Sequence, residues 1–253
     1  MVAGGQYAGP GNLAIPRSLH KAINFLCYFM IVWSLVFPMS WLSGVWGRWG
    51  IILGNLVGTI ANRPSSWTST EALTKYKEQT AVTMSHNLPS ALWAFLIIIQ
   101  LSGSIRKTYP RIHRLCGYLH VAVSVVLMAG VAIMQSRKMY FSMHPAVVWY
   151  INISATWFLF SLGYAVLAAR AHLYRAHRAW MLRHIASGTW VAVQRILIAA
   201  VALPLEHVSG IGQPTEWHRQ VLFGGASVVA FVGCVLFCEI YLWWGLRKQM
   251  KLV

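Results

Sequence analysis

The chain has 253 residues, of which 57% are hydrophobic and only 10% charged, and its mean hydropathy is +0.55. Soluble domains usually carry about 25% charged residues, so this balance is typical of a protein embedded in lipid. The 21 Lys and Arg residues lie between apolar runs rather than on one soluble face, which argues against nucleic-acid binding. Asp is absent and Glu occurs five times, which argues against paired-carboxylate catalysis, a Ser-His-Asp triad and a carboxylate-lined calcium or magnesium site.

The N-terminal part of the chain precedes the core. Residues 1–21 form a Gly/Pro-rich arm, and the first apolar run of membrane length is Ala22–Leu42. Residues 45–85 are interpreted as an interfacial or half-inserted helix at Val45–Ala61, with Gly50, Gly54 and Gly58 on one face, followed by a polar loop. That loop contains Thr68-x-x-Glu71, a capping-box pattern that predicts a short surface helix.

Five further runs approach the roughly 20 residues that a bilayer core requires. They are His86–Ser102, Leu115–Gln135, Ala146–Ala169, Leu182–Leu203 and Val221–Trp244. The sequence therefore predicts an all-α polytopic bundle of six transmembrane helices that forms a single membrane domain over residues 1–253. Residues 86–204 would form its four-helix, motif-bearing core, and residues 221–253 the last span and a basic C-terminus.

Basic residues are distributed unequally between the two sides of this topology. The side with both termini holds 13 Lys and Arg residues, the other side holds 7, and Arg195 lies inside a span. Lys and Arg accumulate in cytoplasmic loops, so the basic side is expected to face the cytoplasm or the mitochondrial matrix.

Four histidines form two pairs with the same spacing. His113 and His120 stand seven residues apart at the head of the third span, and His177 and His184 do so at the head of the fifth. Seven residues are nearly two helical turns, so each pair shares a face. Opposed intramembrane imidazoles can hold a haem b as axial ligands, whereas histidines at headgroup depth are simply solvated or bound to lipid phosphate. Both interpretations stay open at this point.

Arg195 falls near the middle of the fifth span, where an uncompensated charge costs several kcal/mol. The leading interpretation is an ion pair with Glu239, the acidic residue inside the sixth span. The alternative is that Arg195 anchors an anionic group such as a haem propionate, a quinone headgroup or a lipid phosphate. Gln100, Gln135 and Gln194 are expected to hydrogen-bond between helices, and Cys27, Cys116, Cys234 and Cys238 to be small buried hydrophobes.

Residues 86–200 resemble a widespread family of multi-pass membrane proteins that is defined by a domain of unknown function. The resemblance rests on His86, Gln100, the His113-Arg114-x-x-Gly117 element, the His177-Arg178-x-Trp180-Met181-x-Arg183 element and Arg195. It implies membrane residence and a four-helix core, and it implies no reaction. The family pattern has an aromatic residue at the position of His120 and a small polar residue at that of His184, so it assigns neither of them a haem role.

These observations favour a non-catalytic integral subunit of a larger, energy-transducing membrane complex, such as a respiratory complex of the mitochondrial inner membrane with both termini in the matrix. Such a subunit would contact neighbouring subunits and bind phospholipid or cardiolipin through Arg114, Arg178, Arg183 and Trp180. The alternative is a haem b electron carrier with His113, His120, His177 and His184 as candidate ligands and Arg195 at a propionate. A small-molecule transporter is the third hypothesis, and no metal site or catalytic residue is predicted.

Overall fold

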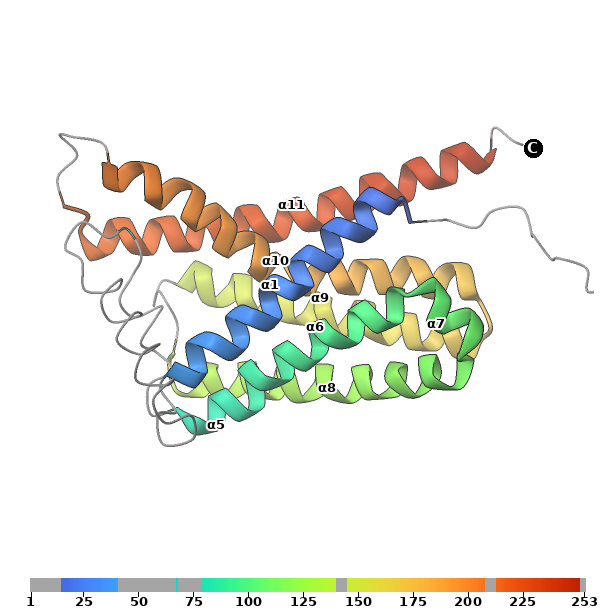
Figure 1. Ribbon diagram of the computed structural model, residues 1–253. Helices are drawn as coiled ribbons and strands as arrows, with labels where there is room; N and C mark the ends of the chain where they lie inside the picture. Colours follow the sequence, from blue (N-terminus) through green and yellow to red (C-terminus); the bar gives the residue numbers. More distant parts are fainter. Residues whose placement is uncertain (1–14, 41–66, 68–78, 140–144, 208–212, 251–253) are drawn as a thin grey trace, which may run out of the picture.

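A computed structural model of the chain describes residues 15–40, 67, 79–139, 145–207 and 213–250. Its helices are α1 (Arg17–Ser40), α5 (Thr80–Val82), the π-helix η1 (Thr83–Asn87), α6 (Leu88–Leu101), α7 (Gly103–Thr108), α8 (Pro110–Ser136), α9 (Pro145–Arg170), α10 (Tyr174–His207) and α11 (Glu216–Met250). The described residues contain no strand, as predicted (Figure 1). The arm up to residue 14, the glycine-bearing segment Val45–Ala61 and the Thr68-x-x-Glu71 pattern lie outside the described residues.

Six described helices are long and apolar enough to cross a bilayer, which confirms the predicted fold class. The stretches of membrane length begin at Arg17, Thr80, Pro110, Val147, Tyr174 and Glu216, and the second of them runs through α5, η1 and α6. The largest difference from prediction is at the fifth span, which starts at Tyr174 rather than Leu182. Since α10 has 34 residues, it is about 51 Å long at 1.5 Å per residue, well beyond the hydrocarbon thickness of a bilayer.

Local sequence fixes several helix ends. Pro110 and Pro145 are the first residues of α8 and α9, where a missing backbone N–H costs nothing. His172 follows α9 in the left-handed region at φ 57°, and the N–H of Leu173 donates to the carbonyl of Ala168 at 2.9 Å. This pattern caps a helix C-terminus and makes the turn into α10 short.

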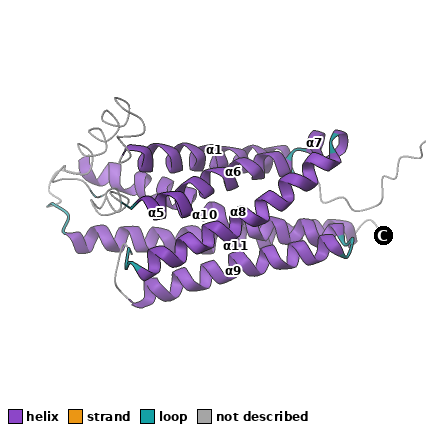
Figure 2. Ribbon diagram, turned by 90° about the horizontal axis from the view of Figure 1, so that it is seen from below, coloured by secondary structure: helices purple, strands orange, loops and turns teal. Residues whose placement is uncertain are grey.

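The long helices form two sets that follow one another along the chain. In the first helix set, α1 and α8 pack on α6, and in the second, α9 and α11 pack on α10. The sets meet where α1 crosses α10 and where α8 touches α9 (Figures 1 and 2). The start of α1, the α6–α8 connection, the α9–α10 connection and the C-terminus lie at the same end of the bundle, at the right of Figure 1. We call this the basic end.

The largest hydrophobic core joins the two sets. It combines Cys27 of α1, Trp93 of α6, Val123 of α8, Phe158 of α9 and Ile185 of α10. Every long helix except α11 therefore contributes to one continuous interior, and the candidate site lies within it.

Candidate functional site

A cavity of about 140 Å³ lies between the two helix sets. Its lining residues come from the second half of α1 and α8, the first half of α9, the middle of α10, η1 and the first turns of α6. The cavity is therefore displaced toward the end opposite the basic end. Five aromatic residues line it, namely Phe29, Trp33, Trp93, Phe158 and Trp190.

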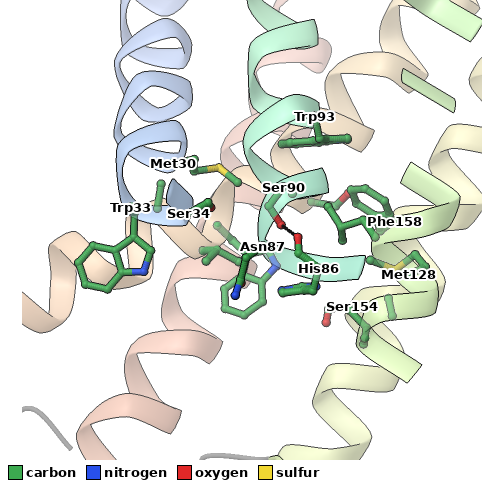
Figure 3. Close-up of a pocket in the computed structure, with 18 of the residues that line it drawn as sticks. Met30, Trp33, Ser34, His86, Asn87, Ser90, Trp93, Met128, Ser154 and Phe158 are labelled. Carbon is green, nitrogen blue, oxygen red and sulfur yellow. Dashed lines mark hydrogen bonds between the residues drawn. The ribbon is translucent and has the colours of Figure 1, made fainter. Parts of the chain in front are cut away.

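The π-helix η1 supplies two polar residues of the cavity wall, His86 and Asn87. A π-helix contains an extra residue per turn, and such segments are frequent at functional sites. Figure 3 shows both side chains projecting from η1 toward the space between α1 and α8. The close approach of η1 to α8 requires Gly130, because a Cβ there would lie 2.6 Å from the Ser85 carbonyl oxygen.

Asn87 lines this cavity, but its amide nitrogen is enclosed by the protein. The residue is 5% exposed, and its Nδ2 is buried with no hydrogen-bond partner among the described residues. A buried amide without a partner costs about 1–3 kcal/mol relative to a satisfied one.

Arg195 also lines the cavity, from α10. Its Nη1 donates to the Gln194 side-chain oxygen at 2.5 Å, and its guanidinium carbon lies 4.9 Å from the Phe223 ring centre and 5.4 Å from that of Trp33. Gln194, the preceding residue of α10, thus supplies one acceptor for this charge. Gln194 in turn donates to the Ser227 hydroxyl of α11, so the hydrogen-bond network joins α10 to α11.

The predicted Arg195–Glu239 ion pair is wrong. Both carboxylate oxygens of Glu239 accept hydrogen bonds from Arg183, from Nε at 2.6 Å and from Nη2 at 2.8 Å. The physical reason is the position of each arginine along α10 relative to Glu239. Because α10 begins at Tyr174, Arg183 is already inside the helix and reaches Glu239, whereas Arg195 is about 18 Å further along the helix axis.

Three serine hydroxyls of the cavity wall donate their protons to backbone carbonyls. Ser90 donates to His86 at 2.5 Å, Ser154 to Ile151 at 2.9 Å and Ser187 to His184 at 2.8 Å. Toward the cavity these oxygens therefore offer lone pairs. Arg195 is the charged side chain among the lining residues, and no described carboxylate lines the cavity.

Next to the cavity, His120 of α8 and His184 of α10 are in direct contact. Their Nε2 atoms are 3.1 Å apart, and the two residues are 1% and 0% exposed. His184 Nδ1 is 3.0 Å from the Phe158 carbonyl oxygen, which can only accept, so this nitrogen carries the proton. His184 Nε2 must then accept, from the Trp93 indole N–H at 3.2 Å and from His120 Nε2–H.

This arrangement does not fit a haem held between His120 and His184. A metal–imidazole bond is about 2 Å long, so two axial nitrogens would stand about 4 Å apart with the macrocycle between them. Here the nitrogens are hydrogen-bonded, and the Trp93 and Phe158 rings pack against the same imidazoles at centroid distances of 5.6 and 4.2 Å. The pair is a hydrogen-bonded junction between the two helix sets.

The other two predicted histidines lie nearer the basic end. His113 is in the first turn of α8, and His177, near the start of α10, has its Nδ1 2.9 Å from the Ala165 carbonyl oxygen. The structure thus separates the four predicted ligands into two sites. His113 and His177 are one, and His120 and His184 are the other.

Two of the residues expected to bind lipid, Trp180 and Arg183, belong to an aromatic cluster near the same end. Trp180 stacks on Tyr164 at 4.9 Å, and the Arg183 guanidinium carbon lies 4.6 Å from the Trp180 ring centre. Arg183 forms an ion pair with Glu239. Arg178 is partly buried on α10. Arg114 is exposed on α8, and its Nε is 3.5 Å from the Pro110 carbonyl oxygen.

The three predicted interhelical glutamines are confirmed. Gln100 donates to the His113 carbonyl at 2.7 Å, Gln135 to the Asn152 side chain at 2.8 Å, and Gln194 to α11 as described above. The sequence analysis missed Asn87 and the aromatic residues of the cavity wall. Comparison of the chain with protein-family models, with curated proteins and with solved structures gave no match.

Proposed function

We propose that this multi-pass membrane protein is a non-catalytic binding protein that holds a small amphipathic molecule in the cavity beside Arg195. The observation that carries the proposal is the cavity of about 140 Å³ itself, which is lined by five aromatic residues and by the polar side chains of His86, Asn87 and Arg195. Aromatic walls with a few polar groups are the usual composition of a small-molecule site.

Native mass spectrometry of the purified protein in mild detergent tests this proposal. Ala155 lines the cavity, so Ala155→Leu places three more carbon atoms in or against it. Ala169 lies on the same helix, is also partly buried and does not line the cavity, so Ala169→Leu is the matched control. Wild type and the control should retain a small molecule that Ala155→Leu loses. A wild-type protein that carries none, and that a total membrane lipid extract does not stabilise, would refute the proposal.

A second candidate function is a subunit of a larger assembly in an energy-transducing membrane, such as a respiratory complex in the mitochondrial inner membrane. Gly225 and Gly233 on α11 favour it, because both are exposed and a Cβ at either would meet no described atom within 4 Å. Outward glycines allow another helix to approach closely in lipid. In this proposal the basic end faces the matrix and carries phospholipid or cardiolipin near Arg114, Arg178 and Trp180.

Native gel electrophoresis of mild membrane extracts tests the second candidate. Gly225→Leu with Gly233→Leu should shift the protein from a large species to a smaller one. Gly163→Leu is the control, because Gly163 of α9 is also outward with open space around it. The same migration for all forms would show that α11 forms no such contact. The family resemblance of residues 86–200 is compatible with either candidate and assigns no reaction.

A further inference from the structure

We infer that the cavity is the substrate site of a membrane carrier, in which the two helix sets rock against each other and expose the cavity to one side of the membrane and then to the other. This inference rests on the proposed binding function and adds movement of the bound molecule across the bilayer. Three features carry it, namely the opposite directions of the two sets, the position of the cavity between them and the hydrogen bonds that hold them together on each side of it.

The two helix sets share one internal plan and run in opposite directions. Each contains three described spans, and in each the middle span contacts both of the others. The first set begins with α1, which starts at the basic end, whereas the second begins with α9, which starts at the opposite end (Figure 1). Many carriers are built from two such inverted units, and their substrate lies near the middle of the membrane where the units meet.

The cavity lies where these two sets meet. Its walls come from both sets, and the span that supplies His86 and Ser90 is interrupted by the π-helix η1, a kind of irregularity that is frequent at functional sites. Contacts within each set are more extensive than those between the sets, which are chiefly the crossing of α1 on α10 and the contact of α8 with α9. Each set can therefore move largely as one body about the cavity.

A buried layer closes the cavity on the side of the basic end. Trp93 and Phe158 are the lining residues of α6 and α9 that lie nearest this end, and Figure 3 shows Trp93 at one end of the cavity. His120 and His184 lie one to two turns nearer the basic end than the lining residues of α8 and α10. The Trp93 indole N–H and the His120 Nε2–H both donate to His184 Nε2, so two hydrogen bonds of this layer join the first set to the second.

A second contact between the sets lies at the opposite edge of the cavity. Gln135, in the last turn of α8, donates to the side-chain oxygen of Asn152 of α9 at 2.8 Å. The cavity thus has hydrogen bonds between the sets on both of its sides. Alternating exposure requires this arrangement, because opening on one side breaks the contacts there while the contacts on the other side hold the sets together.

The walls restrict the class of substrate. The volume of about 140 Å³ is close to that of apolar protein cavities of about 150 Å³ that bind benzene, and five aromatic residues line it. Arg195 in the wall disfavours a cation by charge repulsion. The expected substrate is therefore a small molecule with a compact apolar body and no positive charge.

The test measures access to the cavity from each side of the membrane. Ala155→Cys places a thiol in the cavity wall, and full-length protein in sealed vesicles of either orientation is treated with an impermeant thiol reagent, with unmodified protein as the background. We expect reaction from both sides. Ile153→Cys is the matched control, because Ile153 lies at nearly the same depth of α9, is 61% exposed and does not line the cavity. In lipid it should react from neither side.

Three changes added to Ala155→Cys show whether the two sides alternate. Trp93→Phe removes one hydrogen bond of the buried layer and should raise the labelling rate from the basic side about fivefold, since about 1 kcal/mol corresponds to that factor. Gln135→Leu removes the contact at the opposite edge and favours opening there, so it should lower the rate from the basic side. Gln100→Leu is the control, because Gln100 bonds the His113 carbonyl within the first set, and it should change neither rate.

The outcomes separate this inference from the proposed function. If Ala155→Cys reacts from one side only, or from neither, in all four forms, the sets do not alternate and the inference is wrong. It is also wrong if Trp93→Phe and Gln135→Leu raise both rates together, because that result describes a loosened bundle. A molecule retained by the purified protein would in each of these cases still support the binding function. If no molecule is retained either, both proposals fall.

Discussion

The Nε2 atoms of His120 and His184 lie 3.1 Å apart at the junction of the two helix sets, and Trp93 donates to the same nitrogen of His184. The two imidazoles therefore join α8 of the first helix set to α10 of the second. Because both are buried and in direct contact, a change in one is expected to be partly compensated by a change in the other.

A double-mutant cycle measures that compensation. His120→Phe and His184→Ser should each destabilise the protein, because each leaves buried hydrogen-bonding groups without a partner at about 1–3 kcal/mol. The double variant should lose about 0.5–3 kcal/mol less than the sum of the single losses. Reversible unfolding in mixed micelles gives the free energies. Strict additivity would mean that the imidazole contact contributes nothing.

A second cycle tests the partner of Glu239. Arg183→Ala and Glu239→Ala should show a coupling of about 1 kcal/mol, since the pair is bidentate but Glu239 is 41% exposed and partly screened. The matched cycle combines Glu239→Ala with Arg195→Ala. There the two effects should add within about 0.5 kcal/mol, because the residues are not in contact. Coupling in the second cycle and not in the first would restore the Arg195 pairing.

Gly188 of α10 sets the position of the Trp93 ring. A Cβ at residue 188 would lie 2.2 Å from the Cη2 atom of Trp93, which is too close for any two such atoms. Gly188→Ala should therefore cost about 1–3 kcal/mol of stability and weaken ligand binding, because Trp93 must leave its place in the cavity wall. Gly163→Ala meets open space, so it should be neutral or stabilise by up to about 1 kcal/mol through helix propensity. Thermal unfolding of the two variants side by side checks the contrast.

Asn87 should show opposite effects on stability and on binding. Asn87→Leu removes an unpartnered buried amide, so the ligand-free protein should gain about 1 kcal/mol of stability. The stabilisation that wild type gains from ligand should shrink in the variant. The measurement is the unfolding midpoint with and without a total membrane lipid extract. A loss of ligand-free stability would mean that the amide has a structural role.

Impermeant thiol labelling in sealed vesicles tests the sidedness of the bundle. Leu173→Cys and Tyr109→Cys lie in the connections at the basic end, and Thr215→Cys lies before α11 at the opposite end. The first two should react from the same side and the third from the other. Unmodified protein is the control for the native cysteines, of which Cys27 and Cys238 are buried.

The fold was largely predictable because the length of an apolar run and the distribution of charge are properties of whole segments, so they do not depend on the exact position of any one residue. An apolar run of about 20 residues has few alternatives in lipid, so even approximate boundaries place six helices correctly. The glutamines were predictable for the same reason, since a buried amide in a span finds its partner on another helix.

The site was less predictable because it depends on details that periodicity does not carry. The π-helix shifts His86 and Asn87 relative to an α-helical register. The sequence of Thr83–Asn87 gives no indication of this π-helix apart from a polar stretch before Pro89. The partner of Glu239 was predicted wrongly because an error in the start of α10 changed which arginine shares the depth of Glu239. The spacing of the histidines predicted shared faces correctly, but it could not distinguish imidazoles that contact each other from imidazoles that leave room for a cofactor.

The order of the two helix sets along the chain has a consequence for assembly. All of α1–α8 precedes α9, so a single break between α8 and α9 would yield two fragments, each holding one complete set. The cavity would belong to neither fragment, because its walls come from both. A molecule that binds only the joined form stabilises the complex of the two fragments by mass action. At a ligand concentration one hundred times its dissociation constant, the free energy of association becomes more favourable by about 2.7 kcal/mol. Association of the two co-expressed fragments would then show that the ligand is present.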